Sequence, residues 1–132
     1  MNIKIEHIAI WCKDLEVMKA FYMKYFRMTS NEKYINPVRN FESYFLSFNE
    51  NESTKLELMK RPDIIENLSV RGHLMGFCHL AISVGNRNSV DILTDTLRSD
   101  GYTIMGEPRV TGDGFYESIV EDPEGNWVEI TE

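Results

Sequence analysis

Apolar and polar positions along the first half of the chain predict one helix among several strands. Apolar side chains between Leu15 and Tyr25 recur at helical spacing, and Asp14 stands in the N-cap position before them. The flanking segments are rich in aromatic and β-branched residues, as strands are. The predicted strands cover residues 3–11, 29–35, 41–48 and 54–60, with a polar hairpin tip over residues 49–53.

The second half repeats this order of elements. A helix carrying Val90, Leu93 and Leu97 is expected to begin after a cap at Ser89 or Asn88 and to stop at Asp100-Gly101. The turn sequence Asp122-Pro123-Glu124-Gly125-Asn126 precedes the last strand. The predicted strands of this half cover residues 77–84, 102–107, 115–120 and 127–131.

The two halves are related by a constant shift of 72 positions. His7-Ile8-Ala9-Ile10 recurs as His79-Leu80-Ala81-Ile82, and Lys55-Leu56-Glu57-Leu58 falls on Trp127-Val128-Glu129-Ile130. The same shift places Tyr44 on Tyr116. The sequence therefore predicts a single α+β domain over residues 1–132, built from two β-α-β-β-β modules over about 1–60 and 76–132, with a connector over 61–75. A sheet with one helix leaves a second face to cover, so two modules, from one chain or from two, are expected to enclose a cleft.

Composition narrows the function classes. The chain has 132 residues and a formal net charge of −7, which disfavours nucleic acid as a partner. No stretch reaches membrane-spanning length, and the two cysteines form no paired motif, so we expect a reduced, cytoplasmic protein that contacts no membrane.

Strand alternation gathers four polar side chains on the faces that point away from the helices. His7 shares a face with Ala9 and Trp11, and Glu57 shares one with Lys55 and Met59. Their counterparts are His79 and Glu129. A single histidine or glutamate on a strand is more often structural or solvated, but here both residue types recur at one shift. Two imidazoles and two carboxylates suit one divalent cation with positions left open for substrate. His73 has no repeat partner and is expected in a surface loop, and Lys55 in solvent near a strand end.

These residues carry a family resemblance that covers essentially the whole chain. The repeat, the two His-containing strands and the ending Asp-Pro-Glu-Gly-Asn-Trp-Val-Glu-Ile resemble the vicinal oxygen chelate superfamily of glyoxalases, bleomycin-resistance proteins and dioxygenases. The resemblance implies paired βαβββ modules forming a half-barrel around a metal ion. It also implies a homodimer whose sites take ligands from one chain or from both.

The ligand pattern is closest to that of bacterial glyoxalase I. That resemblance implies a metal centre of His7, Glu57, His79 and Glu129 holding Ni²⁺, Co²⁺ or Zn²⁺. It further implies a metal-dependent lyase or isomerase that acts on a hemithioacetal or another small α-hydroxycarbonyl substrate, with Glu129 as the base and Glu57 as the alternative or second base. The alternatives are another metal-dependent member, such as an acyl-thioester epimerase, and a non-catalytic binding protein of the bleomycin-resistance type.

Two departures concern the substrate pocket. Members that use glutathione carry an arginine at the position matching Trp11 and an asparagine where this chain has Lys60-Arg61. We therefore expect Trp11 and Arg61 to bind substrate, with glutathione disfavoured as the thiol; Arg61 is equally compatible with a solvent-facing position.

Overall fold

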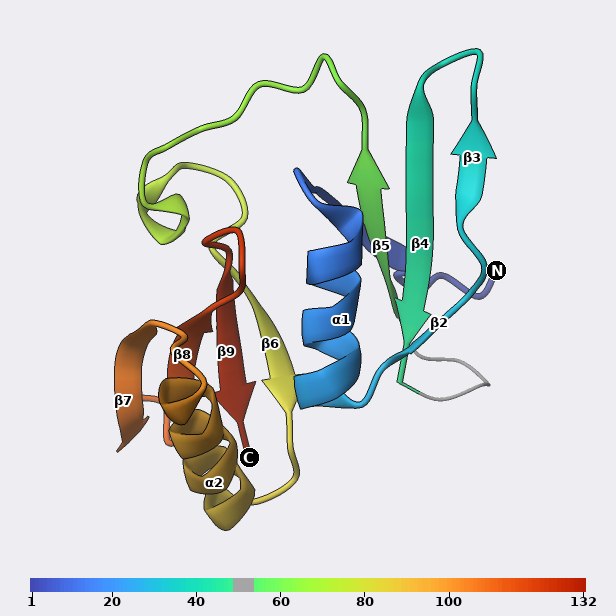
Figure 1. Ribbon diagram of the computed structural model, residues 1–132. Coiled ribbons are helices and arrows are strands. Elements are labelled where there is room, and N and C mark those ends of the chain that lie inside the picture. Colours follow the sequence, from blue (N-terminus) through green and yellow to red (C-terminus); the bar gives the residue numbers. More distant parts are fainter. Residues whose placement is uncertain (49–53) are drawn as a thin grey trace. The chain divides into compact units, whose positions relative to one another are not determined.

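The computed structural model describes residues 1–48 and 54–132 and separates into two compact units, Met1–Glu66 and Asn67–Glu132 (Figure 1). The hairpin tip expected over residues 49–53 lies outside the described residues. Each unit is a mixed α+β structure with one sheet and one α-helix, which confirms the predicted fold class. No helix in the described part of the chain is long and apolar enough to cross a membrane.

The first unit places its helix against a sheet in which the first and last strands are neighbours. The strand order is β1-β5-β4-β2, and β3 pairs with β4. Strands β1 and β5 are parallel, whereas β4 is antiparallel to β5, β3 and β2. Figure 1 shows α1 lying against this sheet, where it contacts β4 and β5. The elements are β1 (His7–Trp11), α1 (Leu15–Phe26), β2 (Thr29–Ser30), β3 (Tyr34–Asn36), β4 (Phe41–Ser47) and β5 (Lys55–Lys60).

The second unit has the same topology with one strand fewer. Its order is β6-β9-β8-β7, again with the first and last strands parallel and adjacent. Helix α2 contacts β7, β8 and β9. The elements are the 3₁₀ turn η1 (Arg71–His73), β6 (His79–Ser83), α2 (Arg87–Ser99), β7 (Ile104–Val110), β8 (Tyr116–Glu121) and β9 (Trp127–Thr131).

The faces assigned from strand alternation are confirmed. Leu56 and Leu58 of β5 are buried, as are Val128 and Ile130 of β9, while the glutamate between each pair faces the other way. Helix α1 buries Leu15, Met18, Phe21, Tyr22 and Phe26, which completes an aromatic-rich core on the helix side of the first sheet. The other face of each sheet is left for a site.

The caps of the two helices were predicted with different success. Asp14 caps α1 as expected, because its carboxylate accepts the backbone N–H groups of Glu16 and Val17. The cap predicted at Ser89 or Asn88 is wrong. Asn86 caps α2, and its side-chain oxygen accepts the N–H of Ser89 at 2.9 Å. A capping side chain bonds the backbone two or three residues later, so the cap lies three residues before Ser89.

The shift of 72 positions holds for β1 and β5 but fails for β4. In the first unit Tyr44 pairs with Leu58, whereas in the second unit Ser118 pairs with Ile130, the counterpart of Leu58. Tyr44 is thus equivalent to Ser118, and its predicted equivalence to Tyr116 is wrong. The first unit has two more residues in the connection between its last two strands, which displaces every position of β4 by two.

Two further strands differ from the bounds that the sequence predicts. The strand expected over residues 29–35 is two short strands, β2 and β3, separated by residues 31–33. The strand expected over residues 102–107 runs instead from Ile104 to Val110, with irregular register on either side of Gly106. Bulges of this kind shift a strand without leaving a pattern in its apolar positions.

Candidate functional site

The first unit brings His7 and Glu57 together on the face away from α1. Parallel pairing places Glu57 opposite Ala9, two residues after His7, and the small alanine leaves the glutamate side chain free to approach the imidazole. The His7 Nε2 atom lies 3.7 Å from Glu57 Oε1. Glu57 is 13% exposed and His7 39%, so the couple is accessible from one side. The edge of the His7 ring rests on Phe45, with ring centroids 5.3 Å apart.

Glu6 fixes the orientation of the His7 ring. Its carboxylate can only accept, so the contact with His7 Nδ1 makes that nitrogen the donor and leaves Nε2 for Glu57 or a cation. Lys55 donates to the same carboxylate at 2.6 Å, and the hydrogen bonds from Lys55 and His7 lower the pKa of Glu6. Lys55 is therefore paired, although half-exposed as expected. Histidines that bind metals usually donate their other ring N–H to a carboxylate, a backbone carbonyl or a water molecule.

The second unit repeats the couple with His79 and Glu129. Glu129 pairs with Ala81, two residues after His79, in the register that the first unit shows for Ala9 and Glu57. The distance from His79 Nε2 to Glu129 Oε2 is 3.3 Å, and Glu129 is 14% exposed. Both halves of the repeat therefore present one imidazole nitrogen and one carboxylate oxygen to the same side of a sheet.

The spacing within each couple fits two ligands of one cation. With bond lengths of about 2.0–2.2 Å, two ligand atoms on the same ion lie roughly 3.0–3.5 Å apart. The couples, at 3.7 and 3.3 Å, are close to this range. In the described residues no three His, Cys, Asp or Glu side chains are grouped so that they could hold a metal ion. Each unit thus supplies half of the four-ligand set that the sequence predicts.

Glu117 is a site residue that the sequence reasoning missed. It lies on β8, pairs with Thr131 next to Glu129, and is only 12% exposed. Burial and a hydrogen bond with Glu129 raise the pKa of Glu117, and Arg109 at 3.8 Å partly opposes them. Its counterpart in the first unit is Ser43, which pairs with Met59. Alternation along the predicted strand 115–120 gives the face of Glu117, but its place beside Glu129 depends on the length of the connection between β8 and β9.

Trp11 and Arg61 lie together at the end of β1. The Arg61 guanidinium lies over the Trp11 ring, 5.4 Å from its centroid, and the Trp11 edge meets Phe41 at 6.2 Å. Arg61 also donates to both oxygens of Asp63, and this pairing lowers the pKa of Asp63. The two predicted substrate-binding residues are thus in contact, with the Arg61 charge already balanced by a carboxylate.

His73 packs against a residue of the site face. It ends the turn η1, and its ring lies edge-on to Trp127, with centroids 5.2 Å apart. Trp127 is the Cα partner of His79. The loop expected at His73 therefore folds back over the strand that carries Glu129.

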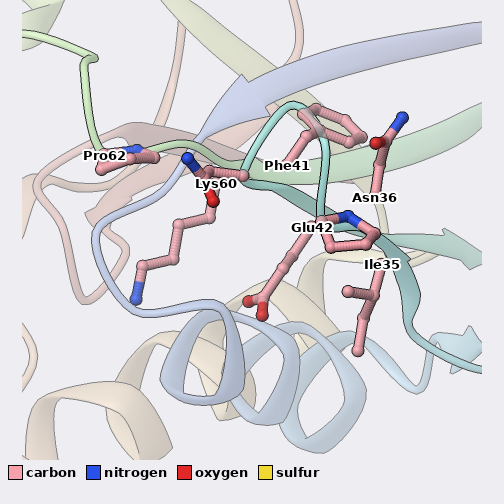
Figure 2. Close-up of a pocket in the computed structure, with 8 residues that line it drawn as sticks. Ile35, Asn36, Phe41, Glu42, Lys60 and Pro62 are labelled. Carbon is pink, nitrogen blue, oxygen red and sulfur yellow. The ribbon is translucent and has the colours of Figure 1, made fainter.

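A separate cavity of about 280 Å³ lies in the first unit, where β5 ends and β4 begins. Figure 2 shows the Glu42 and Lys60 side chains extending to the same side of the sheet. Glu57 and Lys60 are three residues apart on one strand and so face opposite sides. None of the predicted site residues lines this cavity. Its lining residues are Ile35, Asn36, Pro37, Asn40, Phe41, Glu42, Lys60 and Pro62.

The geometry can be compared with known proteins. A family model described as the glyoxalase/bleomycin resistance protein/dioxygenase superfamily matches residues 4–130. The chain belongs to this superfamily. The resemblance inferred from the repeated strands is thereby confirmed. A search of curated proteins finds no match.

Solved structures of the superfamily share the fold. The trypanothione-dependent glyoxalase I of Leishmania major matches with 25% identity and a TM-score of 0.80, over 99% of this chain and 87% of that one. Glyoxalase I of Zea mays matches with 25% identity and a TM-score of 0.79, but this chain spans only 44% of its length. A glyoxalase family protein of Enterococcus faecalis, 22% identical with a TM-score of 0.73 over 98% of this chain and 97% of that one, supports the fold alone.

Proposed function

We propose that this chain is a divalent-metal-dependent lyase or isomerase of the glyoxalase I type. The observation that carries the proposal is the repeated His–Glu couple, present in both units at ligand-like spacing and in equivalent register. Similarity to two proteins named glyoxalase I, each at 25% identity, supports the same class of reaction. The substrate is a small α-hydroxycarbonyl compound, with a hemithioacetal as the leading candidate.

In this proposal His7, Glu57, His79 and Glu129 hold one Ni²⁺, Co²⁺ or Zn²⁺ ion. The cation supplies a Lewis acid that stabilises negative charge on neighbouring substrate oxygens. Glu6 keeps the His7 Nε2 atom available for the ion by holding Nδ1 as a donor. The donor set of two imidazoles and two carboxylates suits these cations.

Glu129 moves the proton. The carbon-bound hydrogen of the hemithioacetal passes as a proton to its carboxylate and returns to the adjacent former carbonyl carbon, while the hydroxyl proton passes to the former carbonyl oxygen. The hydroxyl carbon becomes the thioester carbonyl, and the former carbonyl carbon carries the new hydroxyl group. Glu57 is the alternative or second base, because the repeat gives it the equivalent place in the first unit. The low exposure of both carboxylates favours proton exchange with substrate over exchange with bulk water.

We further propose a homodimer. Each unit supplies two ligands, so a complete set requires both units of one chain or units of two chains. The segment between β5 and β6 carries large apolar side chains that are exposed in the single chain, among them Ile65, Leu68, Met75 and Phe77. A second copy would remove such surface from water. Light scattering is expected to give a dimer mass, and a monomer mass would exclude this part of the proposal.

The test of the reaction is turnover of methylglyoxal with a panel of thiols that includes glutathione. Protein purified without an affinity tag is loaded with Ni²⁺, Co²⁺ or Zn²⁺, and thioester formation is followed by absorbance. Glu129→Gln keeps the side-chain size but cannot accept the proton, so kcat should fall roughly 10²- to 10⁴-fold. Glu32→Gln changes an exposed carboxylate outside the site and serves as the control.

The other outcomes identify the alternatives. An active Glu129→Gln variant would remove Glu129 as the base and leave Glu57→Gln as the next variant to assay. Metal binding without methylglyoxal turnover would favour a different reaction, such as epimerisation of an acyl-thioester. No bound metal, and no activity after Ni²⁺ is added, would favour a binding protein of the bleomycin-resistance type.

A further inference from the structure

Two buried polar atoms on β9 have no hydrogen-bond partner within the described part of the chain. They are the Trp127 indole nitrogen Nε1 and the Thr131 hydroxyl oxygen. Both lie two residues from Glu129, one on each side, so they share its face of the sheet. A buried donor without a partner costs about 1–3 kcal/mol. Two such atoms on one face, flanking the proposed base, point to a ligand that supplies the missing partners.

The Trp127 ring is held in place by the turn η1. A Cβ atom at Gly72 would lie 2.2 Å from the indole carbons, so the Gly72 backbone rests directly on the ring. The His73 ring meets it edge-on. Arg71 donates to the Asn126 side chain at 3.2 Å, which ties the turn to the residue before Trp127. The direction of the indole N–H is therefore fixed before any ligand arrives.

The described residues of the first unit, 1–48 and 54–66, hold no counterpart to this arrangement. Lys55 occupies the position equivalent to Trp127, and its ammonium is bonded to Glu6. The Trp127 indole N–H is thus a feature of the second unit. Trp127 pairs with His79 on the neighbouring strand and lies two residues before Glu129 on its own strand.

We propose that the Trp127 indole N–H is a specificity-determining donor that binds a neutral carbonyl oxygen in the non-reacting part of the substrate. This inference rests on the proposed function for the reacting part. The indole N–H is an uncharged donor that cannot accept, so its partner is an acceptor oxygen. Two acidic residues neighbour Trp127 in the sheet: Glu129 lies two residues further along β9, and Glu121 is the Cα partner of Trp127 on β8. They repel a carboxylate, and the Arg71 guanidinium is engaged with Asn126. An amide or thioester carbonyl satisfies the donor without that repulsion.

The first experiment compares methylglyoxal hemithioacetals of three thiols in the metal-loaded protein. N-acetylcysteamine carries an amide carbonyl, 3-mercaptopropionate a carboxylate, and 1-propanethiol no acceptor. Trp127→Phe keeps a packed aromatic ring but removes the N–H. It should raise KM roughly 2- to 10-fold for the N-acetylcysteamine adduct, as expected for one neutral hydrogen bond, with little change in kcat. KM for the 1-propanethiol adduct should not change.

Two results would overturn the inference. An equal change for all three adducts would mean that Trp127 only packs. A larger change for the 3-mercaptopropionate adduct than for the amide would show that the acceptor is an anion. Gly72→Ala should reproduce the Trp127→Phe pattern, because the new methyl group displaces the ring. Gly112→Ala is the matched control, since a Cβ there meets nothing within 4 Å.

A second experiment does not depend on turnover. The chain has two tryptophans, so an emission change that the unsubstituted protein shows and Trp127→Phe lacks reports on Trp127. Titration with S-methyl-N-acetylcysteamine should shift its emission saturably, whereas methyl propyl sulfide should not. Gly72→Ala should abolish the shift. A shift without any methylglyoxal turnover would reject the proposed reaction and retain the donor, and the absence of a shift would reject the donor itself.

Discussion

The carboxyl group of Glu117 is hydrogen-bonded to that of Glu129, on a face that the repeat had led us to expect to hold one carboxylate in each unit. The two residues come from neighbouring strands, β8 and β9, and Glu117 is slightly more buried than Glu129. One proton shared between two carboxylates relieves their repulsion. The second unit is therefore more acidic at its centre than the first, where Ser43 stands in the equivalent place.

Replacement of Glu117 by glutamine should stabilise the metal-free protein at neutral pH. Burial and Glu129 raise the pKa of Glu117, so the folded state binds this proton more tightly than the unfolded state does. The cost of ionising Glu117 is absent below the unfolded pKa of about 4.3 and grows as the pH rises through the folded pKa. Urea unfolding in EDTA should give equal stabilities at low pH and a more stable variant at neutral pH. Equal stabilities at both pH values would contradict the coupling, and Glu32→Gln is the control.

Each member of the His–Glu couples should be required for metal affinity. Loss of an outer-shell partner costs about 10- to 100-fold in affinity, so removing a ligand itself should cost at least about 100-fold. Calorimetric titration with Ni²⁺ of His7→Ala, Glu57→Gln, His79→Ala and Glu129→Gln should show this loss. If the variants of one unit alone lost affinity, the four-ligand centre would be wrong and one unit would bind the ion with other groups.

Replacement of Glu6 should weaken Ni²⁺ binding less than replacement of a ligand does. The Glu6 carboxylate holds His7 Nδ1 and Lys55 but is not itself a proposed ligand. Glu6→Gln should weaken Ni²⁺ binding about 10-fold or more, while leaving one ion per site. Unchanged affinity would mean that the orientation of His7 is set by packing against Phe45 instead.

Thr94 and Ser118 form a buried hydroxyl pair under α2. Their oxygens are 2.7 Å apart, and both side chains are fully buried. Thr94→Val leaves the Ser118 hydroxyl without this partner and should lower the free energy of unfolding by about 1–3 kcal/mol. Adding Ser118→Ala should recover part of that loss, because no buried hydroxyl then lacks a partner. Denaturant unfolding of Thr94→Val, Ser118→Ala and the double variant measures the coupling, and additive effects would argue that the pair is not a hydrogen bond.

Substitutions at Asn86 and at Ser89, the cap predicted from the sequence, test which of the two residues caps α2. Asn86→Ala should destabilise the protein by about 0.5–2 kcal/mol, because the N–H of Ser89 loses its acceptor. Ser89→Ala keeps that backbone N–H and should have a much smaller effect. Thermal unfolding separates the two, and the reverse order of effects would restore Ser89 as the cap.

The sequence by itself determined the repeat, the fold class, and the face of the sheet on which each histidine and glutamate lies. Strand side chains alternate with a period of two, so the apolar Leu56, Leu58, Val128 and Ile130 fix the opposite direction of Glu57 and Glu129. The parallel pairing of first and last strands then places each histidine beside its glutamate, and one shift relates both couples. The metal that joins them stays a prediction.

Only the tertiary structure decided which residues surround the couples. The register of β8 against β9 depends on the length of the connection between them. The corresponding connection in the first unit is two residues longer, so Ser43 occupies the position that Glu117 occupies in the second unit. The position of the Trp127 ring depends on Gly72, which lies in a connector that has no repeat partner and no periodic pattern of apolar residues. The alternation of apolar and polar residues along a strand shows which face of the sheet a side chain takes. Contacts between separate segments depend instead on the lengths of loops and on how closely two backbones approach, and neither leaves a periodic pattern in the sequence.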